Sequence, residues 1–101
     1  MAQFDLYATP KGIASFLVDL QSDTLARLET RIVAPLVAVR RHEGKPVARL
    51  HPVVTLKGAA YLVVMDELAA VDSHLLGSRV GSLAHHRSDL IAALDLLFTG
   101  I

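Results

Sequence analysis

The pattern of apolar residues changes once along this chain, and that change limits the folds open to it. Up to Met65 the apolar residues form short runs that are separated by turn-forming or polar residues. Near the C-terminal end they recur every three to four residues instead. Short runs with turns between them are typical of antiparallel strands, and the second spacing is that of a helix with one apolar face. The sequence therefore predicts an α+β domain that is mostly β.

The predicted strands are five short segments. They cover residues 3–8, 13–20, 31–40, 47–56 and 59–65, with turns predicted at 9–12, at 42–45 as a hairpin and at 57–58. Pro35 lies inside the third segment, and because proline has no N–H we expect that position at an edge, a bulge or a strand start. Pro52 is expected to bend the fourth segment. Residues 66–81 have a mixed pattern with two glycines and are predicted to be a loop with at most one short turn.

A helix is predicted to open at Ser82 or Ala84 and to stop at Gly100. Its apolar face is formed by residues at i, i+3, i+4 and i+7, namely Leu90, Ala93, Leu94 and Leu97. Short hairpin-linked strands followed by one helix suggest a small, strongly bent antiparallel sheet or barrel with the helix across one end.

Length and composition narrow the class of protein. A chain of 101 residues forms one domain, residues 1–101, and ten basic residues balance ten acidic ones. This balance argues against a protein that finds nucleic acid or an anionic membrane by charge. The absence of cysteine excludes disulfides and thiolate metal sites. Without a leader-like N-terminal stretch we expect a soluble, cytoplasmic protein. A mean hydropathy of +0.45 predicts exposed apolar surface, and hence a homo-oligomer or a partner-binding patch.

Enzyme chemistry finds little support in the sequence. His85 and His86 are adjacent, so on a helix their rings would point about 100° apart and would not converge on one metal ion, although Asp89 shares a face with His85. Asp19 and Asp23 lie four residues apart, but a turn or cap role for Asp23 is the simpler interpretation. The chain contains no phosphate-binding or nucleophile motif. We expect neither catalysis nor a cofactor nor a metal.

The densest basic cluster is the stretch 40–45, Arg-Arg-His-Glu-Gly-Lys. A solvated hairpin tip is one interpretation. The other is a docking point for an acidic segment of a partner.

Several short motifs, in this order and spacing, resemble the CcdB family over the whole chain. They are Val18-Asp19-x-Gln21-Ser22-Asp23, Val33-x-Pro35-Leu36, Leu50-x-Pro52-Val53-Val54, Gly77, His85-x-Arg87, Asp89 and the ending Phe98-x-Gly100-Ile101. Members of this family are small bacterial toxins of toxin–antitoxin pairs that act on DNA gyrase. Each motif alone is weak, and the assignment depends on their combination.

The resemblance implies a strongly curved, SH3-like antiparallel β structure of about five strands with a subsidiary hairpin and a long C-terminal helix. It also implies a homodimer with the C-terminal helices near the two-fold axis. The family's toxin is no enzyme. It binds the A subunit of DNA gyrase while the DNA gate is open and traps the enzyme with its DNA cleaved.

Two contact surfaces follow from the resemblance. The gyrase-binding positions carried over are Ser22, Thr24, Leu25, Ser88, Asp95, Phe98, Thr99, Gly100 and Ile101. A CcdA-like antitoxin, whose disordered C-terminal segment folds on binding, would meet Tyr7, Arg41, His42, Lys45, Met65 and Gly77.

The chain departs from the family at Thr99, where the best-known toxins carry a tryptophan that stacks on an arginine of gyrase. Threonine cannot stack, and the loss of such a hot spot costs about 2–4 kcal/mol, or roughly 30- to 1,000-fold in affinity. Asp95, where the family favours asparagine, adds a negative charge beside the tail.

Three hypotheses therefore stay open. The first is a toxin that poisons gyrase with an altered contact. The second is a CcdB-fold homologue that has lost poisoning and works through antitoxin binding or co-repression, or on another type II topoisomerase. The third is an unrelated enzyme or metal protein using His85, His86 and Asp89.

Overall fold

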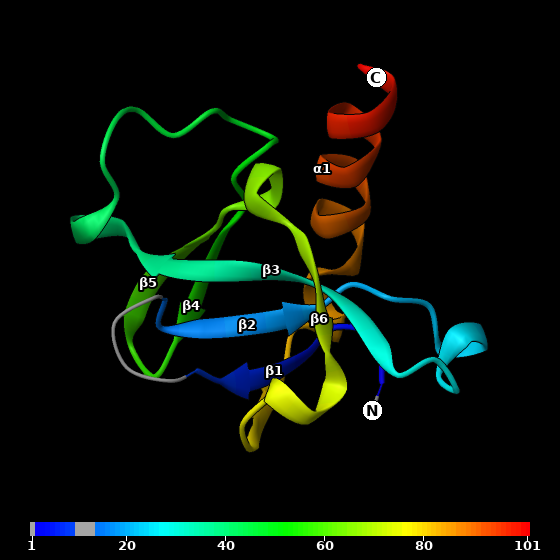
Figure 1. Cartoon of the computed structure of the whole chain (residues 1–101). Coiled ribbons are helices and arrows are strands. Elements are labelled where there is room, and N and C mark those ends of the chain that lie inside the picture. Colours follow the sequence, from blue (N-terminus) through cyan, green and yellow to red (C-terminus); the bar gives the residue numbers. More distant parts are fainter. Residues whose placement is uncertain (1, 10–13) are drawn as a thin grey trace.

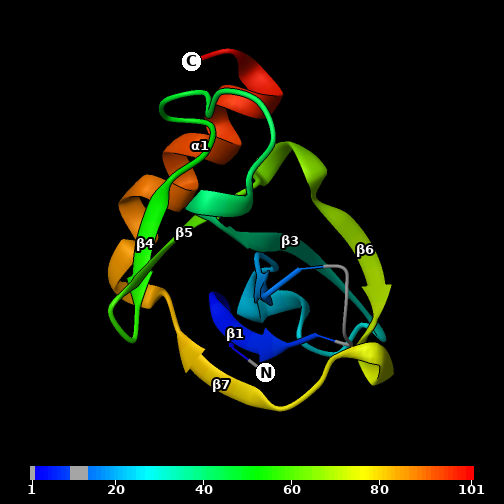
Figure 2. The same ribbon diagram turned by 90° about the vertical axis from the view of Figure 1, so that its left-hand side faces the viewer.

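One antiparallel sheet, curled into a half-barrel, dominates the computed structural model, which describes residues 2–9 and 14–101 (Figures 1 and 2). Its strands are β1 Asp5–Ala8, β2 Phe16–Asp19, β3 Thr30–Ala38, β4 Val53–Leu56, β5 Ala59–Val63, β6 Ala69–Asp72 and β7 Arg79–Ser82. They are ordered β4-β5-β3-β2-β1-β7, and β6 pairs with β3. The predicted fold class is confirmed. Of the predicted turn at 9–12, residues 10–12 lie outside the described part of the chain, as does residue 13 of the predicted second strand.

β3 is the longest strand and pairs with three others. One of its edges pairs with β2, while the opposite edge pairs first with β6, through Val33, and then with β5, from Leu36 onward. Pro35 lies between these two partners, and its carbonyl accepts the Val64 N–H at 2.9 Å. Because this edge changes partner here, the missing N–H of proline breaks no strand pairing. Pro35 is thus at a special position of the strand, as the sequence predicted.

The segment 66–81 is not the loop that the sequence predicted. It contains the strands β6 and β7, which close the sheet around β3 and β1. Both strands are four residues long and contain no fully buried residue, so their sequences carry little of the alternation that marks a strand.

The predicted hairpin at 42–45 and the start of the predicted strand 47–56 are also wrong. After β3 the chain makes a 3-10 turn, η2 Val39–Arg41, and runs through a long segment, the 42–52 loop, before β4 begins. The N–H groups of Leu50 and His51 both bond to the Val47 carbonyl, which closes a turn where a strand was expected. β4 pairs with β5 through a turn at Lys57 and Gly58, and this predicted turn is confirmed.

The helix α1, Arg87–Thr99, confirms the predicted helix and its stop at Gly100. Its predicted start at Ser82 or Ala84 is wrong, because Ser82 ends β7 and residues 84–86 form the 3-10 turn η5, Ala84–His86. Its buried residues Leu90 and Ala93 complete the core beneath the curled sheet, and Leu94 and Leu97 pack against it. The other buried apolar residues of this core are Phe4, Leu6, Val18, Leu20, Ala34, Leu36, Val54, Val63, Met65 and Leu83. No helix in the described ranges is long and apolar enough to cross a membrane.

Candidate functional site

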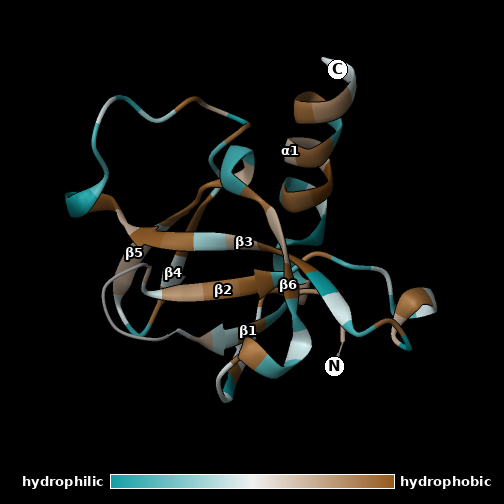
Figure 3. Cartoon of the chain, viewed as in Figure 1, coloured by the Kyte–Doolittle hydropathy of each residue, from teal (hydrophilic) through white to brown (hydrophobic). Residues whose placement is uncertain are grey.

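The free end of α1 presents apolar side chains to solvent. Phe98 is 69% exposed and Ile101 is 78% exposed, at the point where the helix projects past the sheet (Figures 1 and 3). Gly100 ends the helix in the left-handed conformation, with φ 76° and its N–H bonded to the Leu96 carbonyl. Glycine adopts this conformation without strain, so the last residue can turn away from the helix axis. An exposed apolar tip of this kind is suited to contact with a partner.

A narrow stripe of α1 carries three more of the predicted gyrase contacts. Ser88, Asp95 and Thr99 are spaced by seven and four residues, so they lie on one face, opposite the buried Leu90 and Ala93. All three are exposed. The Thr99 hydroxyl donates to the Asp95 carbonyl at 2.6 Å, so its proton is already committed within the helix. The stripe runs roughly 17 Å from Ser88 to Thr99.

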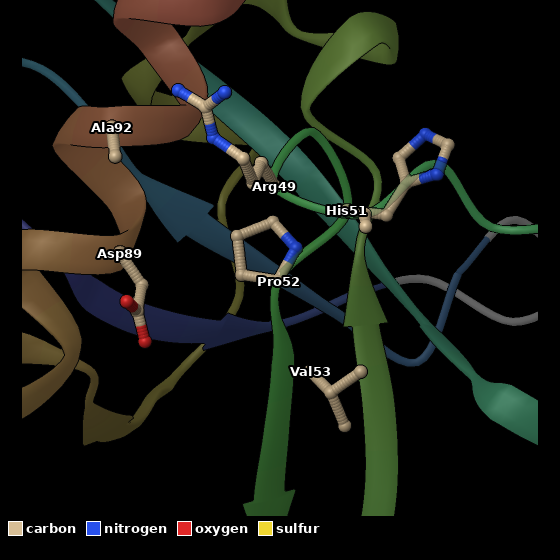
Figure 4. A pocket seen from close by; sticks show the side chains of 7 residues that line it. Arg49, His51, Pro52, Val53, Asp89 and Ala92 are labelled. Carbon is tan, nitrogen blue, oxygen red and sulfur yellow. The ribbon is translucent and has the colours of Figure 1, made fainter.

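The 42–52 loop reaches the same end of the helix. The Arg49 guanidinium donates from Nη2 to the main-chain oxygen of Ile101 at 2.8 Å. Between this loop and α1 lies a cavity of about 340 Å³, into which Arg49 extends toward the helix (Figure 4). The cavity is lined by Ala48, Arg49, His51, Pro52, Val53, Asp89 and Ala92. Nothing in the sequence pointed to this contact, because the two residues are 52 positions apart and Arg49 lay in a predicted strand.

The remaining predicted gyrase contacts form a separate patch in this chain. Ser22, Thr24 and Leu25 belong to the 3-10 turn η1, Asp23–Leu25, and its cap, which lies on the side of the sheet near the beginning of α1 (Figure 1). The buried Gln21 holds this turn by donating to the Leu25 carbonyl at 3.0 Å. Leu25 is 48% exposed. The structure thus does not bring 22–25 and 98–101 together within one chain.

The predicted antitoxin contacts are also divided. Arg41 and Lys45 are exposed and His42 is half-buried, at the end of η2 and in the 42–52 loop. The His42 ring packs edge-on against His51, with the ring centroids 5.5 Å apart. The basic stretch therefore forms the end of η2 and the start of the 42–52 loop rather than a hairpin tip, and its Arg41 and Lys45 side chains are accessible to a partner.

Three other residues predicted for this surface lie elsewhere. Met65 is fully buried in the core, and Tyr7 is 5% exposed on β1. Gly77 packs against the end of β1, where an added Cβ would lie 2.6 Å from the Ala8 carbonyl oxygen. In this chain Tyr7 and Met65 offer a partner little side-chain surface. Their part in antitoxin binding stays a prediction.

A buried charged cluster lies on the outer face of β1, β2 and β3, and the sequence did not reveal it. Asp19 accepts two hydrogen bonds from Arg31, at 2.9 Å from Nε and 2.5 Å from Nη2, and both side chains are fully buried. Arg79 pairs with Asp5 at 3.1 Å. Burial, followed by the nearby carboxylates of Asp5 and Asp19, raises the pKa of Tyr7. Asp19 is thus committed to an ion pair and not free for acid–base chemistry.

Asp23 accepts the Gln3 N–H at 2.7 Å and opens η1, so the predicted turn role is confirmed. The two histidines behave differently from the prediction. Their ring centroids are 4.3 Å apart, and both residues lie in a 3-10 turn rather than in the α-helix. Among the described residues, however, no group of three or more His, Asp or Glu side chains could hold a metal ion.

Residues 3–100 match the family model described as CcdB protein. The fold is also similar to solved structures. A Mycobacterium tuberculosis toxin, MazF-mt6, has a TM-score of 0.73 and 18% identity, over 93% of this chain and 95% of that one. An endoribonuclease in complex with its cognate antitoxin, from mycobacterial species, has a TM-score of 0.73 and 9% identity, over 96% and 93%. A structure described as an Mtb toxin has a TM-score of 0.71 and 18% identity, over 92% and 99%.

Proposed function

Because this chain belongs to the CcdB family, the toxins of toxin–antitoxin pairs, we propose that it binds the A subunit of DNA gyrase and traps the enzyme with its DNA cleaved. It acts by binding and catalyses no reaction. Two copies form a homodimer, and a CcdA-like antitoxin neutralises the toxin through a disordered segment that folds on binding.

The observation that carries this proposal is the exposed apolar tip of α1. Phe98 and Ile101 are 69% and 78% exposed, and no described element of the chain covers them. A tip of this shape can enter an opening that exists in only one state of the target. A ligand that fits one state alone shifts the target toward that state by its differential affinity. Trapping gyrase with an open gate requires only such selectivity.

The 42–52 loop supports the antitoxin part of the proposal. Arg41 and Lys45 are exposed and unpaired with any carboxylate among the described residues. Cations of this kind attract an acidic segment and speed its encounter with the toxin.

The test is a DNA cleavage assay. The purified chain is incubated with gyrase from its own host, supercoiled plasmid and ATP, and linear DNA is counted after denaturation. We expect linear product, and we expect it to disappear when residues 99–101 are deleted. A parallel incubation with labelled RNA tests catalysis directly. Gyrase-independent cleavage of that RNA would contradict a toxin that acts by binding alone.

One observation favours a second candidate, a CcdB-fold homologue without gyrase poisoning. Thr99 has no aromatic ring, and its hydroxyl already bonds to Asp95. Such a protein would act through antitoxin binding and co-repression, or on another type II topoisomerase. A folded dimer that gives no linear DNA with gyrase, yet binds its antitoxin, would favour this candidate. The same assay with topoisomerase IV distinguishes a homologue that acts on another type II topoisomerase from one that acts only through antitoxin binding and co-repression.

A further inference from the structure

One side chain from outside α1 holds the tip of the helix. Arg49 donates to the main-chain oxygen of Ile101 at 2.8 Å, from a loop on the other side of the cavity described above (Figure 4). Within the described residues, no other side chain outside α1 makes a hydrogen bond to residues 98–101. Without this contact, the left-handed Gly100 would leave Ile101 attached to the helix by one flexible residue.

The 42–52 loop is tied down close to Arg49. The Nδ1 atom of His51 accepts the Val47 N–H at 2.9 Å, and Nε2 lies 2.7 Å from an Asp66 carboxylate oxygen. Since Nδ1 accepts, the ring proton is on Nε2 and is donated to Asp66. This ring therefore links the loop to the 3-10 turn η3, Met65–Glu67, next to the core.

Arg49 itself has a strained backbone. Its φ is 73°, in the left-handed region that side chains other than glycine seldom adopt. A residue is kept there only when its surroundings impose the conformation, and such strain is concentrated at functional positions. The strained backbone and the anchored loop together direct the guanidinium toward Ile101.

We propose that Arg49 is a positioning residue, which holds the C-terminal tip in its binding conformation before the target arrives. The inference rests on the proposed function, because the target of the tip is gyrase. A tip that is already ordered loses less conformational entropy on binding. Such ordering adds affinity in a chain whose Thr99 supplies no stacking contact. Arg49 thereby offsets part of the affinity that threonine costs.

The test uses the full chain and two independent measurements. The variants are Arg49→Ala, which removes the guanidinium, and Arg49→Gly, which removes it and also relieves the backbone strain. The matched control is Lys57→Ala, because Lys57 is another exposed cation with a positive φ, of 50°, but lies in the β4–β5 turn away from the tip. Thermal unfolding of each variant checks that it is folded, and Arg49→Gly remains usable if Arg49→Ala is unstable.

The first measurement needs no gyrase. The heteronuclear ¹⁵N NOE of the Gly100 and Ile101 amides reports the order of the tip on the nanosecond timescale. We expect lower values in both Arg49 variants and unchanged values in Lys57→Ala. Unchanged values in folded Arg49 variants would overturn the proposal.

The second measurement is the toxin concentration that gives half-maximal linear DNA with gyrase. We expect a rise of about 3- to 10-fold in the Arg49 variants, the range of one hydrogen bond, and no rise in Lys57→Ala. Arg49→Lys tests whether the charge alone matters. Full potency in Arg49→Lys with a loosened tip would show that Arg49 contacts the target as a cation, and would overturn positioning. If the unaltered chain gives no linear DNA, the proposed function fails and the link to gyrase fails with it, while the NOE values still decide whether Arg49 orders the tip.

Discussion

At the scale of single residues, the buried ion pair of Asp19 and Arg31 carries a high desolvation cost. Both charges are removed from water, and the Nη1 atom of Arg31 has no hydrogen-bond partner among the described residues. The carboxylate of Asp19 also accepts the Gln21 N–H at 2.9 Å, so it fixes the start of the segment that leads to η1. Each charge of such a pair offsets the desolvation cost of the other, so a buried charge that loses its partner strongly destabilises the folded chain.

Removing one charge of the pair should therefore lower the free energy of unfolding more than removing both charges. We expect Asp19→Leu to lower the free energy of unfolding by about 3–5 kcal/mol, because it leaves the Arg31 charge buried and unpaired. The double variant Asp19→Leu with Arg31→Met should lose less than the sum of the losses in the single variants Asp19→Leu and Arg31→Met. Urea unfolding of all four proteins measures the coupling. Additive losses would contradict a tightly coupled pair.

Tyr7 makes stability depend on pH in the alkaline range. Its pKa is raised in the folded chain, chiefly by burial, so the folded chain keeps the phenol proton where the unfolded chain loses it. The contribution of the Tyr7 phenol to the free energy of unfolding is therefore fully present below about pH 10 and is lost as the pH rises further. We expect Tyr7→Phe to make the decline in the free energy of unfolding above pH 10 less steep. Urea unfolding at a series of pH values measures the slope, with Tyr61→Phe as the matched variant. An alkaline decline in Tyr7→Phe as steep as in the unaltered chain would contradict the prediction.

At the scale of elements, Gly77 fixes how the segment before β7 crosses the end of β1. A Cβ at position 77 would lie 2.6 Å from the Ala8 carbonyl oxygen and 3.2 Å from its carbon, so main-chain atoms would have to move. We expect Gly77→Ala to cost about 2 kcal/mol or more. Gly81 is the matched control, because its added Cβ would meet only the Leu6 Cδ1 at 3.7 Å. Thermal unfolding should separate the two variants, and equal losses would count against a steric role for Gly77.

Elements with a strong local pattern were predictable, and those without one were not. The helix and the turn at Lys57 and Gly58 are set by residues close in sequence. β6 and β7 are short edge segments whose pairing with β3 and β1 comes from distant residues. The 42–52 loop contains apolar residues that imitate a strand, but the His51 ring closes a turn there.

The candidate site follows the same rule. The contact role of Phe98 and Ile101 came from the match to the family's ending, because the apolar pattern alone leaves open whether these residues are packed or exposed. The contact of Arg49 with Ile101 was not, because it joins residues 52 positions apart. For the same reason, the separation of 22–25 from the tip needed the folded chain.

At the scale of the whole molecule, a 101-residue chain leaves many large apolar side chains in water. Phe98 and Leu75 are each 69% exposed, at opposite parts of the fold, and Val53 is 57% exposed. A small fold has too little interior to bury them all. Part of this exposed apolar surface could form the interface of the predicted homodimer. The family resemblance places that interface at the helix end, near the two-fold axis.

The homodimer can be tested without gyrase or antitoxin. We expect the chain to sediment at equilibrium with twice its mass of 10.9 kDa. The family resemblance places the two helix ends side by side, so one side of each Phe98 ring would meet the other copy while Ile101 stays open to the target. Since Phe98 then acts twice, once from each copy, Phe98→Ser should weaken dimerisation by at least about 30-fold. Leu75→Ser removes an equally exposed apolar residue from the other part of the fold and should leave the dimer intact. A monomer at all concentrations would contradict the dimer itself. A dimer weakened by Leu75→Ser and not by Phe98→Ser would place the interface away from the helix end, leaving both tips free to act singly.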